Sequence, residues 1–324
     1  MDEFAFIKQI KQATYKQSSL IKGVGDDAAI FRTHGSDVVT AVDTFVDGVH
    51  FTTHTSSFVQ IGYKALSANI SDMAAMGAEP KFYLVSIVIP PSLREGSLTE
   101  IYDGMEQIAT KYHIDLIGGD TVSGEELVVS ITIIGYVASN KARLRSDAKS
   151  DDIVFVTGTL GDSAAGLHLL THNINENREN KQYFIHRHQM PSPRIEIALH
   201  LRHLNRVCLN DVTDGIANEL REIAEASDVD IVIEDDLIPV HQNFYQFKKE
   251  QQDKWKLFGG EDFELVGTMS EDNWQELKQI AKQLKVNVTR IGHVKIKDSE
   301  DPKVFLKKHD TISDIPKDGY THLK

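Results

Sequence analysis

The 324-residue sequence contains a single cysteine, Cys208, within the apolar run Val207-Cys208-Leu209. One thiol cannot form a disulfide or a cysteine-ligated metal site within one chain, so we expect Cys208 to be buried and chemically silent. The sequence also lacks a run of about eighteen apolar residues, the minimum for a membrane-spanning helix. Its start, MDEFAFIKQIKQ, carries charges where a secretory signal needs an apolar core. These absences predict a cytoplasmic protein that does not cross a membrane.

Positive charge is scarce. The chain has 35 Lys and Arg against 48 Asp and Glu, a formal net charge of −13. Nucleic acids are bound by clustered Lys and Arg, so this balance argues against a nucleic-acid partner. An anionic substrate would need cations as intermediaries. The sequence also lacks a GxxxxGK[ST] loop and the HRD and DFG motifs, which excludes the two commonest phosphoryl-transfer scaffolds.

The composition is that of a folded globular protein, with 41 % apolar and 26 % charged residues. β-like and helical stretches alternate, and the length favours two domains. We expect an α+β (mixed α/β) fold with one domain over residues 1–140 and a second over 141–324. The polar stretch 139–152 is predicted to connect them. Residues 172–183 lack periodicity and predict a surface insertion.

Periodicity predicts the individual elements. Strands are expected at 37–42, 82–89, 127–137, 153–157, 229–233, 264–268 and 286–294, and helices at 57–76, 98–112, 162–170, 216–226 and 271–284. The long β-branched run 127–137 predicts a buried strand. Leu116-Ile117 predicts a short β segment that is closed by a turn at Gly118-Gly119-Asp120.

Several aspartates stand beside glycines and small residues. They fall in Gly25-Asp26-Asp27, Asp43-Thr44 with Asp47, Asn69-Ile70-Ser71-Asp72, Gly118-Gly119-Asp120 and Asp211-Val212-Thr213-Asp214. A single aspartate of this kind is usually a cap, because its side chain accepts hydrogen bonds from nearby backbone N–H groups. Asp72, however, falls in a helix of small residues, where a carboxylate without a partner packs badly. The set could converge only around a cation, and Mg²⁺ with oxygen ligands fits best.

Other polar motifs have ordinary explanations. Gly158 to Gly166 (GTLGDSAAG) follows a β segment and opens a helix, which could present N–H groups to an anion. A strand-to-helix turn capped by Asp162 or Ser163 explains it at least as well, so we assign it no catalytic role. The motif Gly259-Gly260-Glu261 is typical of a plain turn before a strand.

Three further residues gain interest only from a family comparison. His50, between Val49 and Phe51, is typical of a half-buried packing histidine. Arg143 and Arg145 are typical of solvated charges in a connection between domains.

Taken in order, the motifs resemble those of the thiamine-monophosphate kinase family, within the aminoimidazole-ribotide synthetase superfamily. The resemblance runs nearly end to end, through GVGDDAA, AVDTFVDGVHF, NISDMAAMGAEP, LIGGDT, RLRSDAKSDD, VTGTLGDSAAGL, RHQMPSPR, DVTDGIA, GGEDFEL and GYTHL. It implies ATP-dependent phosphorylation of thiamine monophosphate to thiamine diphosphate by direct, Mg-assisted in-line transfer. It also implies a homodimer, in which the N-terminal sheets of two subunits form a barrel-like core and a C-terminal α+β domain packs against it.

Motif position implies the site residues. Several Mg²⁺ ions would be held by Asp27, Asp43, Asp72, Asp120, Asp211 and Asp214. ATP would contact Gly119, Arg145, Thr213 and Tyr102, and thiamine monophosphate would contact His50, Glu261 and Tyr320. Two departures stand out. Ala41 and Val42 replace the Thr or Ser that family members often carry there, and Ile315-Pro316-Lys317-Asp318 replaces a segment that often contains Trp.

The chemistry fits the residues, because phosphoryl transfer needs charge neutralised and two oxygens held in line rather than covalent help. A phosphate acceptor is already ionised at neutral pH, which fits the lack of a Ser-His or Cys-His arrangement. Two alternatives remain open from the sequence. One is an enzyme like aminoimidazole-ribotide synthetase, and the other is a non-catalytic protein that binds divalent ions or nucleotides.

Overall fold

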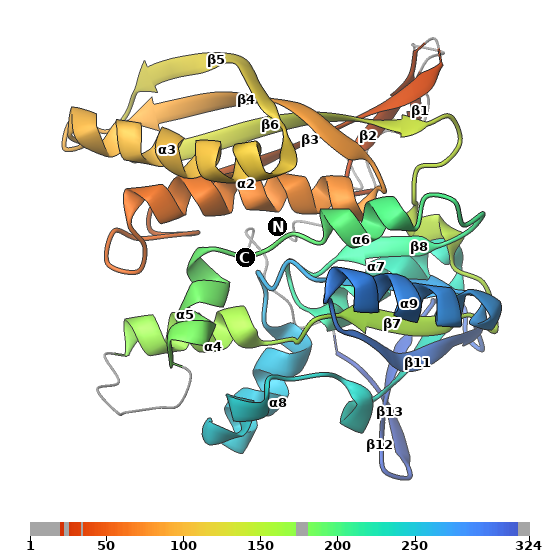
Figure 1. Ribbon diagram of the computed structural model, residues 1–324. Coiled ribbons are helices and arrows are strands. Elements are labelled where there is room, and N and C mark those ends of the chain that lie inside the picture. The colour runs from red at the N-terminus through yellow and green to blue at the C-terminus, as the bar shows by residue number, and fades with distance from the viewer. Residues whose placement is uncertain (1–19, 23–25, 34, 173–180, 317–324) are drawn as a thin grey trace.

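The computed structural model describes residues 20–22, 26–33, 35–172 and 181–316 (Figure 1). Tyr320, predicted to contact the substrate, lies outside the described residues. Within them the fold is α+β with two sheets, as predicted. The first sheet belongs to the N-terminal half and the second to the C-terminal half. The predicted domain boundary at residue 140 falls between the strands that end at Ala138 and begin at Ile153.

The described part of the N-terminal half forms a six-stranded sheet in the order β1-β2-β3-β6-β4-β5. Its strands are β1 (Leu20–Lys22), β2 (Ala29–Arg32), β3 (Ser36–Val46), β4 (Glu79–Ile89), β5 (Asp115–Ser123) and β6 (Val128–Ala138). Neighbours pair antiparallel except β4 and β5, which are parallel. Because β5 is the last strand in this order, it is an edge strand, and every one of its residues is exposed.

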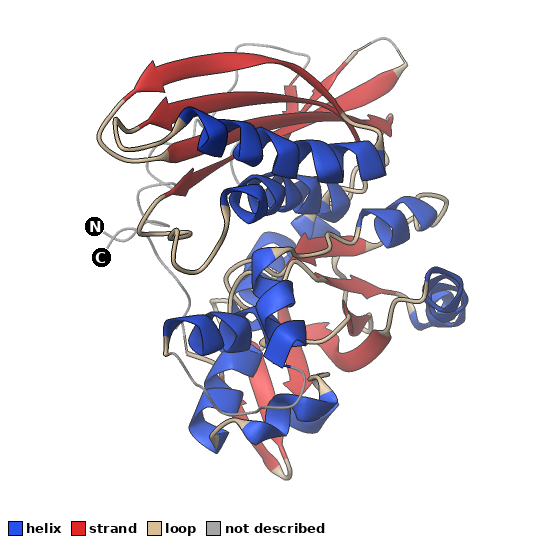
Figure 2. Ribbon diagram, turned by 60° about the vertical axis from the view of Figure 1, so that its left-hand side comes forward, coloured by secondary structure: helices blue, strands red, loops and turns tan. Residues whose placement is uncertain are grey.

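Helices α2 (Phe58–Ala75) and α3 (Glu95–Tyr112) lie together on one face of this sheet, as Figure 1 and Figure 2 show. Ser57 caps α2, because its side chain accepts a hydrogen bond from the backbone of Gln60 while the Gln60 side chain bonds back to Ser57. The two helices approach closely at a glycine. A Cβ on Gly62 would lie 1.8 Å from the carbonyl oxygen of Ile101, so only a glycine fits there.

Two predictions about these strands were wrong. Gly118, Gly119 and Asp120 do not form a turn but continue the strand β5. A Cβ on Gly119 would lie 1.9 Å from the carbonyl oxygen of Val85, so the glycines allow β5 to run close against β4. The run 127–137 is not buried on both faces. Burial alternates along β6, because α2 and α3 cover only one face of the sheet.

The C-terminal half contains a seven-stranded sheet in the order β13-β12-β9-β11-β7-β10-β8, counted over the described residues. Its strands are β7 (Ile153–Thr157), β8 (Cys208–Asp211), β9 (Val229–Glu234), β10 (Leu265–Met269), β11 (Val288–Ile296), β12 (Val304–Lys308) and β13 (Thr311–Asp314). Its α-helices are α4 (Asp162–Thr171), α5 (Lys181–Gln189), α6 (Ile195–His200), α7 (Ile216–Ser227), α8 (Lys249–Phe258) and α9 (Trp274–Leu284). Short 3₁₀ helices are η1 (Arg145–Asp147), η2 (Asp235–Leu237), η3 (Gln242–Gln246) and η4 (Glu271–Asn273).

Periodicity located β7, β9, β10, β11, α4, α7 and α9 of this half and missed α5, α6, α8, β8, β12 and β13. The strand at 153–157 has the predicted bounds. Residues 181–183 belong to α5 rather than to a surface insertion. This helix was missed because its buried face includes Arg187 and His188 beside Phe184, so it lacks an apolar stripe.

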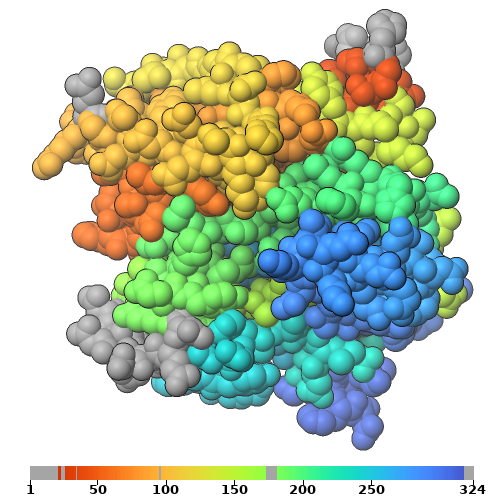
Figure 3. All heavy atoms as spheres, viewed as in Figure 1, coloured from red at the N-terminus to blue at the C-terminus, as the bar shows by residue number. Residues whose placement is uncertain are grey.

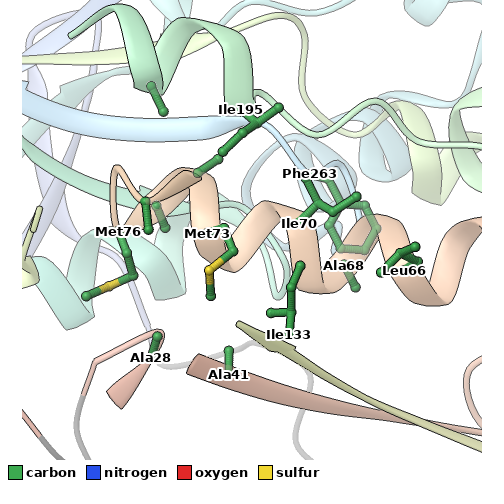
Figure 4. Close-up of a cluster of buried hydrophobic side chains, with 14 of the residues drawn as sticks. Ala28, Ala41, Leu66, Ala68, Ile70, Met73, Met76, Ile133, Ile195 and Phe263 are labelled. Atoms are coloured by element: carbon green, nitrogen blue, oxygen red, sulfur yellow. The ribbon is translucent and has the colours of Figure 1, made fainter. Parts of the chain in front are cut away.

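One hydrophobic cluster runs through both halves, which meet along a continuous boundary (Figure 3). Ile195 and Phe263, from the C-terminal half, lie against α2 on the side opposite Ala41 and Ile133 of the first sheet (Figure 4). The helix α2 is thus buried between the two halves, which explains its run of small residues. None of the described helices is both long and apolar enough to cross a lipid bilayer.

The connection between the halves is less solvated than predicted. Arg143 is 2 % exposed, and its guanidinium donates to the carbonyl oxygens of Leu201 at 2.6 Å and Leu204 at 2.8 Å. Interpreting Arg143 as a solvated linker charge was wrong, because it caps carbonyl groups at the end of α6. Cys208 is fully buried as expected.

Candidate active site

A cavity of about 1040 Å³ lies between the two halves of the chain. Its walls come from β3 and α2 on one side and from α4, α8 and the loops after β8 and α8 on the other. Its lining includes five aspartates, Asp27, Asp43, Asp72, Asp211 and Asp214. It also includes the apolar side chains of Phe45, Phe51, Leu167, Trp255 and Phe258. The cavity therefore offers both carboxylates and aromatic side chains to a ligand.

The aspartates of this cavity come from distant parts of the sequence. Asp27 precedes β2, Asp72 lies in the last turns of α2 and Asp211 ends β8, yet each offers an oxygen within 4.8 Å of the other two. Asp43, inside β3, also lines the cavity and lies close enough to Asp72 and Asp211 to interact with both. The fold thus brings together four of the predicted metal ligands.

Burial and mutual repulsion make these carboxylates hard to ionise together. Burial raises the pKa of Asp43 to about 6, and the charge of Asp211 adds to that rise. Burial likewise raises the pKa of Asp72 well above its usual value, with further contributions from Asp43 and Asp211. Burial is also the main reason why the pKa values of Asp27 and Asp211 are raised. Like charges held in a desolvated site call for a compensating cation.

Two of these carboxylates also have buried oxygens without hydrogen-bond donors among the described residues. They are Oδ2 of Asp27 and Oδ2 of Asp211. A buried carboxylate oxygen that accepts no hydrogen bond is unfavourable unless something else supplies positive charge. Hard divalent cations prefer oxygen ligands of this type. The residues present therefore fit Mg²⁺.

Arg145 compensates part of the negative charge of these aspartates. Its Nη2 lies 2.6 Å from Oδ1 of Asp27 and 3.1 Å from Oε2 of Glu222. Its Nε donates to the side-chain oxygen of Asn210 at 3.2 Å. The side chain is 16 % exposed and lines the cavity, so it is not the solvated linker charge suggested by its surroundings in the sequence.

The loop after β8 is shaped by an acid that sequence reasoning missed. Glu219, in the first turn of α7, accepts hydrogen bonds from the backbone N–H of Asp214 at 2.9 Å and of Thr213 at 3.3 Å. These bonds fold the loop so that Thr213 and Asp214 line the cavity. A Glu near the start of a helix is a common sequence signal for such a contact.

The loop Gly259-Gly260-Glu261 forms another wall and carries the predicted substrate residue Glu261. The Glu261 backbone has φ +63°, and its N–H donates to the carbonyl oxygen of Thr213 at 2.7 Å. Lys64 of α2 lies 2.7 Å from Oε1 of Glu261, and Nδ1 of His188 lies 3.5 Å from Oε2. Both partners were missed by sequence reasoning. His50 lines the same cavity and accepts a hydrogen bond from the Val46 N–H at its Nδ1.

The glycine-rich start of α4 does not offer an anion site. The carboxylate of Asp262 accepts hydrogen bonds from the backbone N–H of Gly161 at 2.6 Å and of Ser163 at 3.0 Å. The position that a phosphate could take at this helix N-terminus is therefore filled by the protein's own side chain. The predicted strand-to-helix turn is present, but the predicted cap was wrong: Gly161 is the N-cap of α4, and Asp262 rather than Asp162 or Ser163 accepts the backbone hydrogen bonds.

Comparison with known proteins places this geometry in a family. Residues 25–137 match the N-terminal domain of the AIR synthase related proteins, and residues 149–304 match their C-terminal domain. The chain is 48 % identical to the thiamine-monophosphate kinase of Bacillus subtilis, over 100 % of both chains. It is 36 % identical to the thiamine-monophosphate kinase of Escherichia coli, over 84 % of this chain and 83 % of the relative.

The chain belongs to the thiamine-monophosphate kinase family. A crystal structure of thiamine-monophosphate kinase from Stenotrophomonas maltophilia is similar, with a TM-score of 0.77 and 32 % identity over 93 % of this chain and 96 % of that one. A second structure, of AaThiL complexed with AMPPCP and TMP, has a TM-score of 0.84 and 28 % identity, over 99 % of this chain and 97 % of that one. The resemblance inferred from the motifs is confirmed.

The fold brings together most of the residues that resemblance to the thiamine-monophosphate kinase family implies. Thr213, Arg145, His50 and Glu261 line the cavity together with five of the six predicted aspartates. Gly119 and Asp120 lie on the exposed edge strand β5, and Tyr102 lies on α3. None of these three lines the cavity in the described part of this chain. Their roles remain predictions.

Proposed function

We propose that this enzyme transfers the γ-phosphate of ATP to the phosphate of thiamine monophosphate and so produces thiamine diphosphate. Relatives aligned over the full chain or most of it carry the name thiamine-monophosphate kinase. The similar AaThiL structure is complexed with AMPPCP, an ATP analogue, and with TMP. A cavity lined by both carboxylates and aromatic side chains suits these substrates, because their phosphates can bind through cations and their rings can stack.

The observation that carries the proposal is the cluster of Asp27, Asp72 and Asp211. Its crowded carboxylates and unpaired oxygens are suited to several Mg²⁺ ions, with Asp43 and Asp214 as further ligands. Bound Mg²⁺ would neutralise the phosphate charge that builds up during phosphoryl transfer. Asp120 is the sixth proposed ligand.

The side chains around this cluster would position the two substrates. Arg145 can donate paired hydrogen bonds to phosphate oxygens of ATP, and the Thr213 hydroxyl lies on the same wall. Gly119 and Tyr102 are further proposed ATP contacts. At the acceptor end, Glu261 and His50 offer polar contacts to thiamine monophosphate, with Tyr320 as a third. Trp255 and Phe258 offer faces for its aromatic rings.

No protein base is needed in this reaction, since the attacking phosphate oxygen is ionised at neutral pH. The protein's task is then to exclude water and to hold the two phosphates in line. His188, the histidine nearest to Glu261, supports this view. Burial and, to a smaller extent, the charge of Lys64 lower its pKa to about 3, so it is too weak a base to take up a proton at neutral pH.

We also propose a homodimer formed through the uncovered face of the first sheet. That face carries partly or largely exposed apolar residues, including Val42, Leu84, Ile134 and Tyr136. An apolar sheet face of this size usually has a partner. The strand β5, with Gly119 and Asp120, borders it, so a second copy would bring these residues toward a cavity that they do not reach in their own chain. We further propose a cytoplasmic location and a domain boundary near residue 140.

A turnover assay tests the function. ADP release is measured with Mg²⁺ and ATP against thiamine monophosphate, thiamine and an aminoimidazole ribotide precursor, and the product is weighed by mass spectrometry. We expect turnover with thiamine monophosphate alone and a product heavier by one phosphate group. Preference for the aminoimidazole precursor would favour the synthetase alternative. Ligand binding without turnover of any acceptor would favour a non-catalytic protein.

A further inference from the structure

Lys64 is a buried cation whose charge has no ordinary structural explanation. It lies in α2 among small and apolar residues and is 2 % exposed. Within the described residues its ammonium forms an ion pair with one group, Oε1 of Glu261 at 2.7 Å. A buried lysine is unfavourable unless it is paired, so this contact must serve either stability or function.

The position of the pair relative to the cavity favours function. Glu261 and His188 line the cavity wall, whereas Lys64 does not. The ammonium therefore lies behind the carboxylate as seen from the cavity. Oε2 of Glu261 lies 3.5 Å from Nδ1 of His188, and that nitrogen lies 3.0 Å from Oγ of Ser163. The Glu261 carboxylate is thus contacted by Lys64 at Oε1 and by His188 at Oε2, while Glu261 also lines the cavity.

The Glu261 backbone could not hold the carboxylate in place by itself. Glu261 follows Gly259 and Gly260 and has a left-handed φ of +63°, which is unfavourable for a residue with a side chain. Its loop belongs to the C-terminal half, whereas Lys64 belongs to a helix of the N-terminal half. The ion pair therefore joins the loop to a rigid element.

The same helix carries Asp72 of the acidic cluster. Lys64 and Asp72 are eight residues apart in α2, a rise of about 12 Å along an α-helix and a rotation of about 80° around its axis. The helix α2 thus fixes the metal end of the cavity directly through Asp72 and the acceptor end indirectly through Lys64 and Glu261. Lys64 and Asp72 therefore hold fixed positions relative to each other, because both belong to the single helix α2.

From this juxtaposition we infer that Lys64 is a positioning residue, which orients the Glu261 carboxylate toward the organic part of the acceptor substrate. The inference rests on the proposed function, because it takes Glu261 as a contact of thiamine monophosphate. Lys64 itself does not touch the substrate. Its removal should weaken acceptor binding and leave the ATP end intact.

The test compares Lys64→Met, which keeps the length of the side chain without its charge, with Lys64→Arg, which keeps the charge. We expect Lys64→Met to raise KM for thiamine monophosphate about tenfold while KM for ATP and kcat change by less than about twofold. Lys64→Arg should restore much of the acceptor affinity. Lys256→Met is the matched control, since Lys256 is a buried lysine that is paired with Asp235, and neither of these two side chains lines the cavity. That control should leave both KM values unchanged.

A double-mutant cycle with Glu261→Gln separates positioning from a general structural effect. If Lys64 acts through Glu261, then Lys64→Met adds no further rise in KM to that of Glu261→Gln. Additive effects, an unchanged KM for the acceptor, or equal changes in both KM values would each overturn the inference. If Lys64→Met fails to fold, Lys64→Gln takes its place in the same cycle. Failure of the proposed function is distinct, because wild-type protein would then show no turnover of thiamine monophosphate.

Discussion

Nη2 of Arg145 lies 2.6 Å from Oδ1 of Asp27, at the edge of a cluster where Asp72 and Asp211 carry further negative charge. Arg145 compensates the charge of Asp27 and lines the cavity, and the proposed function assigns it a contact with the phosphates of ATP. We predict that Arg145→Ala raises KM for ATP about tenfold and raises KM for thiamine monophosphate less.

The same change should lower the free energy of unfolding by about 3 kcal/mol in EDTA, because it leaves a buried carboxylate unpaired. Urea unfolding with and without Mg²⁺ measures this effect. Arg290→Ala is the control, since Arg290 forms an exposed pair with Glu271 that contributes less than about 1 kcal/mol. An unchanged KM for ATP would remove Arg145 from the ATP site.

Neutralising an aspartate of the cluster should abolish activity without destabilising the protein. Burial raises the pKa of Asp72, and Asp43 and Asp211 add to that rise, so Asp72→Asn relieves repulsion in the metal-free state. We expect turnover to fall at least about a hundredfold, while the melting temperature in EDTA stays level or rises.

A paired buried aspartate provides the contrast. Asp37 is 1 % exposed and accepts hydrogen bonds from Arg32 and from the Asn140 N–H, so Asp37→Asn should destabilise the protein by about 1–3 kcal/mol with little effect on kcat. Near-normal turnover of Asp72→Asn at saturating Mg²⁺ and ATP would show that the cluster is structural.

The free energy of unfolding should decrease as pH falls below 6.5, because folding keeps His188 neutral. Burial lowers its pKa from 6.5 to about 3, whereas in the unfolded chain the imidazole binds a proton near 6.5. Between these values the unfolded state binds more protons, so stability is fully present above pH 6.5 and is lost as pH falls. The slope contributed by one such group is at most about 1.4 kcal/mol per pH unit.

Chemical unfolding at pH 6.5, 6.0, 5.5 and 5.0 measures that slope. We expect His188→Asn to reduce the dependence of the unfolding free energy on pH by the equivalent of about one bound proton. Asparagine can still bond to Ser163 but does not titrate. His54→Asn, at an exposed position, should leave the slope as it is. A slope that is equal in wild type and His188→Asn would contradict a buried neutral imidazole.

Mixed dimers test whether Asp120 serves the cavity of a second copy. Asp120→Asn and Asp211→Asn should each be inactive alone. If each site takes Asp211 from one subunit and Asp120 from the other, random mixing restores about a quarter of the sites. Activity of refolded mixtures measures this recovery, with Asp72→Asn mixed with Asp211→Asn as a control that should stay inactive. No recovery in either mixture would place Asp120 outside a shared site.

The limits of prediction from sequence follow from which contacts are local. β7 could be predicted because four of its five residues are β-branched or aromatic apolar residues in one run, and the strand starts after Asp152 and ends before Gly158. The helix α5 could not be predicted, because its buried side includes Arg187 and His188, whose partners are far away in the sequence. Arg187 donates to Glu264, 77 residues later. A buried charge looks like a solvated one until its partner is known.

Site residues within recognisable motifs were predicted from the sequence. Residues that only contact a motif residue in the folded structure were missed. Asp27, Asp72 and Asp211 were identified from glycine-flanked and small-residue motifs, although their distances were not predictable. Lys64 was missed, yet a signal existed. It stands as a single charge in a run of small and apolar helical residues, eight residues before Asp72.

The hydrophobic cluster shared by the two halves restricts how ligands can exchange. A hinge opening of the cavity would pull Phe263 and Ile195 away from α2 and expose them to water. Each large apolar side chain exposed in this way costs about 1.5–3 kcal/mol, so wide separation of the halves would be rare during turnover. Substrates should instead enter and leave past small local movements of the loops, with the two halves moving as one body.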